Sequence, residues 1–429
     1  MGVNYRYLRP AKAEALKQWY NNGFEKRANL KCGCYENATI LPLRKTDNDG
    51  TMFGLGGVQD EAGTYLPVSG IRMRVGGYYD ANPVDFRNER VVYCGYWVKH
   101  WGHFLVEAVT RMWYCLENDE NVDYFVFVSE ENGPTALYGN YKEFFELLGV
   151  SDKILVLNKP VRFSHVLVPE IGYDRKFYYT DKYKAIFDRI AKKAAACSRK
   201  ETRWPERVFL SRSQFAKARQ AEAGLDLLDD YFERNGFEVL YPEKMSLTDM
   251  VCYLRNAQVC AMESGTLPHN MLFAQDGQKT LIVERQTTIN EIQVDVDRIR
   301  NLQVTYIDGY YGIYPVRAGY GPYIMAYTQY FERFTVDHSY TEPDSYYRSQ
   351  TYTRKSLDQY MRVYKNAYGY KWGIEGWQMK YADLFYEAYI DSTKDLEVYL
   401  NRTRPFCLGQ ITEAHFWKQL LKKVLSKIR

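Results

Sequence analysis

The chain has 429 residues, of which 46% are hydrophobic and 26% are charged, a composition typical of folded globular proteins and not of disordered chains. Its 57 basic and 53 acidic residues leave a net charge of only +4. This balance argues against a protein that binds nucleic acid through a strongly basic surface, so nucleic acid is not expected as a partner. The length predicts two domains and an appended segment.

The cysteine pattern and the N-terminus predict a cytoplasmic setting. Only Cys32 and Cys34 lie close together, and no second pair matches a zinc-binding pattern. Other cysteines occur in apolar runs such as VVYCG and AQVCAM, so we expect reduced core cysteines. The N-terminal sequence contains no stretch typical of a signal peptide, and no run of about 18 apolar residues predicts a membrane span.

Residues 1–90 have a weak pattern in which glycine-rich pieces indicate loops and short strands. From residue 90, apolar runs predict strands at VVYCG, DYFVFVSE, KILVLN and SHVLVPE. Helical periodicity predicts helices at 101–117, at NYKEFFELLGV and at 181–199. Alternating strands and helices predict a mostly parallel sheet.

A polar segment at 197–206 is expected to be a linker, after which a second alternation begins. Strands are predicted at RVFLSR, FEVLYPE, AQVCAM and TLIVER, and helices at LDLLDDYFERNG, SLTDMVCYLRNA and PHNMLFAQDG. Gly236 is expected to end the first of these helices, and Ser246 to cap the second, with Asp249 three residues later.

The two units predict an α/β fold with an N-terminal domain (1–196), a second domain (207–325) and a C-terminal helical extension (326–429). A cleft is expected between the first two domains. Ligands of open α/β sheets bind beyond the carboxyl ends of the strands, so the functional residues are expected there.

The strongest local signal is AMESGTLPHNMLF at 261–273, where a buried strand runs into a Ser-Gly-Thr turn. Pro268 takes the expected first position of a helix, and the free N–H groups of such a turn suit an anion such as a diphosphate. Glu263, at the end of the strand, would accept hydrogen bonds from ribose hydroxyls. The alternative is an ordinary strand–turn–helix connection.

Arg212 in FLSRS would project from the end of another strand toward the same crevice. A guanidinium is always charged and binds phosphate with two parallel hydrogen bonds. Lys217 and Arg219 would add positive charge. A surface salt bridge is the alternative for Arg212.

The stretch GHFLVEAVTR places His103, Glu107 and Arg111 at steps of four, which on a helix means one face. A carboxylate among apolar residues would suit a general base, which contributes about 10²–10⁴-fold in rate. The alternative is a common ion pair between Glu107 and Arg111 along the helix.

Two further patterns have alternative interpretations. Asp295 and Asp297 in DVD would suit a metal-binding carboxylate pair, but the flanking residues favour a charged surface segment. The last residues, 411–429, combine apolar residues at helical spacing with a lysine-rich opposite face. That pattern is typical of a helix on an anionic membrane surface, and equally of a helix docked on the protein with a solvated lysine face.

Taken together, these residues resemble glycosyltransferase family 61. The family pattern has a strand ending in Ser-Arg, a region rich in Arg and Glu, a gf-v-y-Pro-Glu-x-x-Ser segment and a Gly-containing turn with Asn before Leu-Phe. FLSRS, KARQAE, GFEVLYPEKMSL and SGTLPHNMLF match it here. HFLVEAVTR matches the first-domain pattern of His-x-x-x-Asp/Glu followed by Arg, and the resemblance covers about residues 90–285.

The resemblance implies a GT-B-like fold of two Rossmann-like domains, inverting transfer from a nucleotide-sugar donor, and no required metal or other cofactor. The donor is expected to be UDP-linked. Glu107 is the implied catalytic base, with His103 as second choice. With the motifs above, the residues expected to bind substrate are Arg111, Arg212, Lys217, Glu263, Ser264, Gly265, Thr266, His269 and Asn270. Ser264-Gly265-Thr266 stands where many members have His-Gly-Ala, and Ala221-Glu222 where Asn-Glu is usual, so the donor sugar cannot be inferred.

The expected function is transfer of a hexosyl, pentosyl or N-acetylhexosaminyl group to a glycan or lipid-linked glycan acceptor in bacterial surface polysaccharide synthesis (capsule, LPS or exopolysaccharide). Domain closure would exclude water from the reaction. The enzyme would be cytoplasmic, with 411–429 holding it at the inner face of the cell membrane. The alternative is a non-catalytic nucleotide-sugar or glycan-binding partner subunit on the same fold, which would need no base at Glu107.

Overall fold

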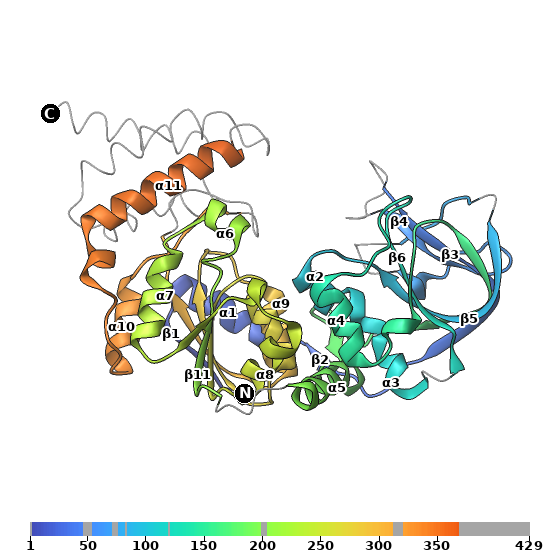
Figure 1. Ribbon diagram of the computed structural model, residues 1–429, viewed down its shortest axis with the longest axis horizontal. Coiled ribbons are helices and arrows are strands. Elements are labelled where there is room, and N and C mark those ends of the chain that lie inside the picture. The colour runs from blue at the N-terminus through green and yellow to red at the C-terminus, as the bar shows by residue number, and fades with distance from the viewer. Residues whose placement is uncertain are drawn as a thin grey trace.

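The computed structural model describes residues 2–45, 54–70, 76–81, 84–118, 121–198, 204–311 and 321–368. These residues form two lobes, each built around a six-stranded sheet (Figure 1). The α/β class predicted from the sequence is confirmed. The GT-B-like arrangement and the three domain boundaries stay predictions, and the C-terminal segment 411–429 lies outside the described residues.

The first lobe contains the described residues between 22 and 197, and its sheet has the order β4-β3-β8-β5-β6-β7. The strands are β3 (Cys32–Arg44), β4 (Leu55–Gln59), β5 (Asp85–Tyr96), β6 (Tyr124–Val128), β7 (Ile154–Leu157) and β8 (Val161–Pro169). β5 pairs in parallel with β6 and β8, and β6 with β7, whereas β3 runs antiparallel to both β4 and β8. The sheet is therefore mixed, and all four strands predicted from residue 90 are confirmed.

Helices and short elements complete the first lobe. They are η1 (Pro67–Ser69), α2 (Trp101–Val106), η2 (Ala108–Tyr114), α3 (Cys115–Asn118), α4 (Gly139–Leu148), η4 (Ser151–Lys153) and α5 (Asp181–Cys197), with a small sheet of β2 (Glu25–Lys26), β9 (Tyr173–Asp174) and β10 (Tyr178–Tyr179). The continuous helix expected over 101–117 is wrong. The α-helix ends at Val106, Glu107 leaves helical geometry (φ −128°, ψ −47°), and a 3₁₀-helix follows.

The second lobe has a sheet in the order β1-β16-β15-β14-β11-β13, in which every neighbouring pair is parallel. Its strands are β1 (Gly2–Tyr7), β11 (Arg207–Leu210), β13 (Glu238–Leu240), β14 (Val259–Glu263), β15 (Lys279–Glu284) and β16 (Gln303–Asp308). A separate ribbon pairs β12 (Glu222–Ala223) with β17 (Tyr323–Ile324). The four strands predicted after the linker are confirmed.

The helices of the second lobe are α1 (Pro10–Asn21), α6 (Ala216–Ala221), α7 (Leu225–Arg234), η5 (Pro242–Lys244), α8 (Leu247–Asn256), η6 (Leu267–Phe273), α9 (Glu291–Ile299), α10 (Gln329–Asp337), η7 (Ser345–Arg348) and α11 (Gln350–Tyr368). They include the three helices predicted after the linker, the third of them as the 3₁₀-helix η6, and also α1 and α6, which were not predicted. The side chain of Ser246 accepts a hydrogen bond from the Asp249 N–H at 3.0 Å, which confirms the predicted cap of α8. Gly236 lies just beyond α7 with a left-handed φ of 74°, as expected for a helix end.

The chain starts in the second lobe and not in the first. β1 pairs in parallel with β16 at the edge of the second sheet, and α1 packs against α9. Lys12 Nζ lies 2.7 Å from Glu284 Oε2, and both side chains are almost completely buried. Residues 2–21 thus belong structurally with a sheet whose other strands begin two hundred residues later.

The two lobes share an apolar interface formed by α4, α5, α8 and η6. The ring centroids of Phe187 and Phe273 lie 5.2 Å apart, and those of Phe144 and Phe273 lie 6.4 Å apart. One cluster of buried side chains runs through this contact from lobe to lobe, and each lobe has a further buried cluster of its own. An extended apolar contact between two lobes opposes their relative motion. The contact therefore favours a fixed arrangement of the two lobes and opposes wide closure of one lobe onto the other.

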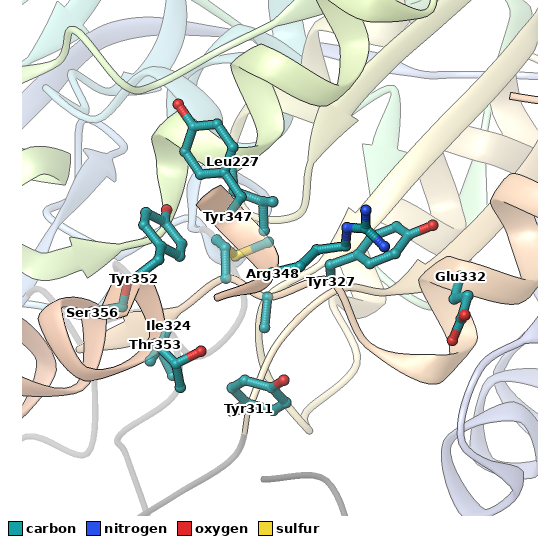
Figure 2. Close-up of a pocket in the computed structure, with 12 residues that line it drawn as sticks. Leu227, Tyr311, Ile324, Tyr327, Glu332, Tyr347, Arg348, Tyr352, Thr353 and Ser356 are labelled. Carbon is teal, nitrogen blue, oxygen red and sulfur yellow. The ribbon is translucent and has the colours of Figure 1, made fainter. Parts of the chain in front are cut away.

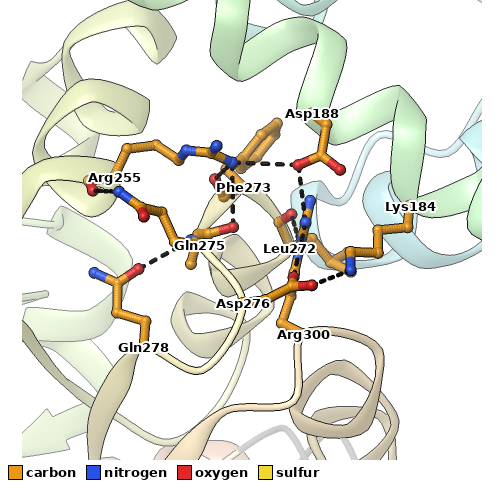
Figure 3. Close-up of polar contacts among 10 residues, drawn as sticks. Lys184, Asp188, Arg255, Leu272, Phe273, Gln275, Asp276, Gln278 and Arg300 are labelled. Atoms are coloured by element: carbon orange, nitrogen blue, oxygen red, sulfur yellow. Dashed lines mark hydrogen bonds and ion pairs between the residues drawn. The ribbon is translucent and has the colours of Figure 1, made fainter.

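A polar network borders the same interface (Figure 3). Asp188 of α5 accepts from Arg300 at 2.9 Å and from Arg255 at 3.2 Å. Lys184 of α5 pairs with Asp276, which also lies near Arg300. The side chain of Arg300 is 1% exposed, so its charge requires these carboxylates.

Within the ranges described above, no helix is long and apolar enough to span a membrane. The expectation that the cysteines are core residues holds in part. Cys94, Cys115, Cys252 and Cys260 are buried, but Cys34 and Cys197 are exposed.

Candidate active site at the lobe interface

The carboxyl edge of the second sheet gathers charged side chains. Arg212 lies just beyond β11, Glu263 ends β14, and Arg285 follows β15. Because the strands are parallel, these ends meet at one edge, where ligands of α/β sheets bind. Charged side chains therefore lie together at the strand ends, where the sequence predicted a ligand site.

These three side chains and that of Glu222 form one ion-pair cluster. Arg212 lies 3.1 Å from Glu222 Oε1 and 3.2 Å from Glu263 Oε1. Arg285 contacts the same oxygen of Glu222 at 2.9 Å. The Arg212 side chain is 17% exposed and the other three are at most 6% exposed. Arg212 thus makes salt bridges, but in a buried cluster and not at the surface, and it is the member that a ligand can reach.

Burial raises the pKa of Glu263 well above its ordinary value, and the negative charge of Glu222 raises it further, while Arg212 and Arg285 act in the opposite direction. This carboxyl group therefore keeps its proton to a higher pH than an exposed glutamate. When protonated, Glu263 no longer needs the guanidinium of Arg212 as a counter-charge.

The turn after β14 is built against this cluster. Gly265 has a left-handed φ of 131°, and a Cβ at this position would lie 2.5 Å from Nη2 of Arg285. Asn290 Nδ2 donates to the carbonyl oxygen of Gly265 at 2.8 Å, and the backbone N–H of Arg285 donates to Ser264 Oγ at 3.2 Å. The glycine is required both by its backbone angle and by the close approach of Arg285.

The 3₁₀-helix η6, which follows this turn, is the contact surface for α2 of the first lobe. A Cβ added to Gly102 would lie 2.8 Å from Thr266 Cγ2 and 2.9 Å from His269 Nδ1. Trp101 Nε1 donates to Asn270 Oδ1 at 2.7 Å. The structure therefore brings the predicted residues Thr266, His269 and Asn270 into contact with the helix that carries His103.

His103 and Glu107 form the first-lobe part of the site. His103 Nδ1 lies 3.1 Å from Glu107 Oε2, and the His103 side chain is 29% exposed, against 11% for Glu107. The ring of His100 lies 4.8 Å from that of His103 between centroids. The more accessible member of the His103–Glu107 pair is the histidine.

Electrostatic interactions cross the interface. The pKa of His269 is lowered to about 3, mainly by burial and next by the nearby His103. The pKa of His100 is lowered first by burial and then by His103, and Arg212 of the second lobe contributes in the same direction, against Glu107. Electrostatic interactions thus link His100, His103 and Glu107 of the first lobe with His269 and Arg212 of the second.

Arg111 lies apart from this group. Its side chain is 1% exposed and donates to the carbonyl oxygens of Val68 at 2.7 Å, Gly70 at 3.0 Å and Pro169 at 2.9 Å. The break at Glu107 turns Arg111 toward the first sheet, so the predicted row of three residues on one face is not formed. The side chain of Lys217 lies outside the described residues.

Among the residues that the structure describes, no group of three or more His, Cys, Asp or Glu side chains has an arrangement that could hold a metal ion. The interpretation of DVD as a charged surface segment is wrong, because both aspartates are buried in α9. Asp295 accepts from Tyr173 Oη at 2.8 Å, and Asp297 from Tyr20 Oη at 2.5 Å and Tyr306 Oη at 2.6 Å. Hydrogen bonds from tyrosine hydroxyls thus stabilise these two buried carboxylates, which the sequence pattern predicted to be exposed to solvent.

Sequence reasoning missed four members of the site: His100, Glu222, Arg285 and Asn290. Arg285 had a usable signal, because it directly follows a predicted strand, as Arg212 does. His100 had a weaker one, since it lies three residues before His103. Glu222 had a signal too, because it ends the motif KARQAE and stands where the family pattern has Glu after Asn. Asn290 had none, because it lies outside the strands and motifs, and only the folded chain brings it to the cluster.

Comparison with known protein families matches a central segment of the chain. Residues 101–283 match the family model described as Glycosyltransferase 61, which covers somewhat less than half of the chain. No curated protein matches the chain. The matched segment begins at α2 and ends within β15, so it contains His103, Glu107, Arg212 and Glu263. The match supports glycosyltransferase family 61, and with it a glycosyltransferase activity that uses a donor and an acceptor.

Proposed function

We propose that the protein is an inverting glycosyltransferase that moves a sugar from a nucleotide-sugar donor, expected to be UDP-linked, to a hydroxyl group of a glycan or lipid-linked glycan. We assign it to bacterial surface polysaccharide synthesis, at or near the inner face of the cell membrane, without a required metal. The observation that carries the proposal is the His103–Glu107 pair on one lobe, which lies beside His100, a residue whose charge interacts with Arg212 of the ion-pair cluster on the other lobe.

In the proposed reaction, His103 removes the proton of the acceptor hydroxyl. Its Nδ1 faces Glu107 Oε2 at 3.1 Å, so Nε2 is the nitrogen available to the acceptor. The carboxylate of Glu107 orients the ring and stabilises the imidazolium that forms, as in a catalytic dyad. The greater exposure of His103 favours it over Glu107 as the group that meets the substrate, which reverses the roles expected from the sequence.

The acceptor oxygen then forms a bond to the anomeric carbon on the face opposite the nucleotide. The bond between that carbon and the diphosphate oxygen breaks, and the diphosphate leaves with the electron pair. Arg212 and Arg285 supply positive charge where the negative charge develops. Because burial raises the pKa of Glu263, its protonated form leaves the charge of Arg212 available to the diphosphate.

The test is turnover across a panel of nucleotide-sugars, with and without EDTA, for wild type, His103→Gln and Glu107→Gln. We expect His103→Gln to lose at least about 10²-fold in kcat. Glu107→Gln should lose less, because the variant keeps the imidazole of His103 and removes only the carboxylate that orients it. His165→Gln, in β8, is the matched control and should leave turnover unchanged.

The outcomes separate the alternatives. Full activity in both His103→Gln and Glu107→Gln would exclude this pair as the base. Loss in Glu107→Gln alone would return the role of base to the glutamate. Donor binding by wild type without turnover, in the presence of glycan acceptors, would favour a non-catalytic binding subunit. Loss of turnover in EDTA would contradict metal independence.

A further inference from the structure

A pocket of about 200 Å³ lies in the second lobe and is not lined by any residue of the candidate active site. Its walls come from α7, β17, α10, η7 and α11, together with Tyr311 (Figure 2). Pockets for drug-sized ligands have volumes of about 300–1,000 Å³, so this one is suited to a smaller group, the size of a single sugar ring.

Tyrosine dominates the lining. Tyr311, Tyr327, Tyr347 and Tyr352 enclose the space from different sides (Figure 2), and Thr353 and Ser356 add hydroxyl groups from α11. Tyrosine presents an apolar ring face beside a group that donates and accepts hydrogen bonds. A pyranose has the same combination of C–H faces and hydroxyl edges, so the lining matches a sugar better than it matches an apolar chain.

The charges of the pocket argue against an anionic ligand. Glu332 and Arg348 are the charged residues of its described lining. The guanidinium of Arg348 already lies 2.6 Å from Glu342 Oε2, which is outside that lining. Recognition of a phosphate or carboxylate needs positive charge in excess of the neighbouring acids, and the described lining offers none.

We propose that this pocket binds one neutral sugar residue of the acceptor or product glycan, away from the residue that reacts. The proposal rests on the proposed glycosyltransferase function and adds a second carbohydrate site to it. A glycan held there remains bound while its reacting end is exchanged, so the pocket raises the effective concentration of acceptor.

The ribbon of β12 and β17 connects the pocket to the ion-pair cluster. Ile324 lines the pocket, while the ring of its neighbour Tyr323 lies 4.4 Å from the guanidinium carbon of Arg285. Successive residues of a strand point to opposite sides, so the pocket and the cluster lie on the two faces of this ribbon. The sugar site is therefore close to the donor edge without sharing its residues.

The experiment measures saturation-transfer NMR of the full chain, without donor, using the methyl glycosides of glucose, galactose and N-acetylglucosamine as probes. Thr353→Trp fills the pocket, and Thr351→Trp, on an exposed position of the same helix, is the matched control. We expect wild type and Thr351→Trp to bind at least one probe equally, and Thr353→Trp to bind it at least about tenfold more weakly. Tyr311→Leu, which keeps apolar bulk but removes the ring, should weaken binding about twofold to tenfold.

Absence of binding to all three probes in wild type, or equal binding in Thr353→Trp, would overturn the proposal. If Thr353→Trp unfolds, Tyr311→Leu decides, since unchanged sugar binding in that variant would also overturn it. Nucleotide-sugar turnover by wild type is measured separately. Failure of turnover with intact, pocket-dependent sugar binding counts against the proposed reaction and not against the pocket.

Discussion

Trp101 of the first lobe donates its indole N–H to the side-chain oxygen of Asn270 in the second lobe at 2.7 Å. The amide nitrogen of Asn270 donates in turn to the carbonyl oxygen of Leu267 at 2.9 Å. Asn270 is 2% exposed, so both polar ends of its side chain depend on these bonds. One hydrogen bond thus fixes the helix that carries His103 relative to the turn that carries Gly265.

Replacement of Trp101 by Phe should lower both stability and turnover. The change leaves Asn270 Oδ1 buried without its donor, which costs about 1–3 kcal/mol in free energy of unfolding. We expect kcat to fall more than donor affinity, because the reacting groups of the two lobes lose their alignment. Urea unfolding and steady-state kinetics measure the two effects. Trp204→Phe, whose ring packs on Tyr253, is the control, and equal effects of the two changes would contradict the proposed alignment.

Replacement of Gly265 by Ala should reduce donor affinity by displacing Arg285. The new Cβ would lie 2.5 Å from the guanidinium, which must then leave Glu222. Gly277→Ala is a matched control, since Gly277 also has positive φ (77°) but no atom within 4 Å of an added Cβ. Gly277→Ala should lower the free energy of unfolding by about 1 kcal/mol, because alanine is strained at this backbone angle. A larger loss of donor binding in Gly265→Ala, measured by calorimetry, is expected; equal losses would argue against a role for Arg285.

Replacement of His269 by Gln should reduce the sensitivity of the protein to acid. The pKa of His269 is lowered to about 3 by burial, whereas a histidine in the unfolded chain titrates near 6.5. The folded state therefore binds fewer protons between these values. Stability that is present above about pH 6.5 is lost as the pH falls toward 3, at up to about 1.4 kcal/mol per pH unit.

The measurement is the free energy of unfolding at several pH values from 4 to 7. His269→Gln should show a shallower pH dependence than wild type. An unchanged slope in His269→Gln would mean that other groups carry the acid sensitivity.

Replacement of Asp188 by Asn should loosen the lobe interface. Asp188 is the nearest counter-charge of the buried Arg300, and Asp276 lies farther from it at 3.4 Å. We expect a loss of about 1–3 kcal/mol, reduced from the value for a fully buried pair because the Asp188 side chain is 44% exposed. Asp181→Asn, whose partner Lys26 is exposed, should lower the free energy of unfolding less than Asp188→Asn does, because solvent screens an exposed ion pair. Similar values for both variants in thermal unfolding would show that Asp188 does not stabilise the interface.

Local patterns predicted much of the fold. Each strand and helix between Tyr124 and Phe273 that had a clear apolar period is present, because burial of one face depends on neighbours in sequence. The break at Glu107 escaped prediction, since α- and 3₁₀-helices have similar spacing of apolar residues. The pairing of β1 with β16 also escaped, because no local pattern marks a partner three hundred residues away.

The sequence predicted the part of the candidate site that lies at the ends of strands. Arg212 and Glu263 end predicted strands, and the structure pairs them. The approach of His103 to His269 could not be predicted, because it depends on how two lobes pack. Arg111 illustrates the reverse case: it follows the expected spacing, but a change of helix type turns it to the backbone of the first sheet.

The first 21 residues supply the edge strand of the second-lobe sheet, and this limits how chimaeric enzymes can be designed. The second lobe consists of two separate stretches of sequence, with the first lobe inserted between them. A single crossover between related enzymes would combine the sheet of one parent with the edge strand of the other, and would place Glu284 opposite a foreign residue in place of Lys12. Exchange of the donor-side lobe therefore requires two junctions, one after α1 and one between α5 and β11, so that the edge strand moves with its sheet.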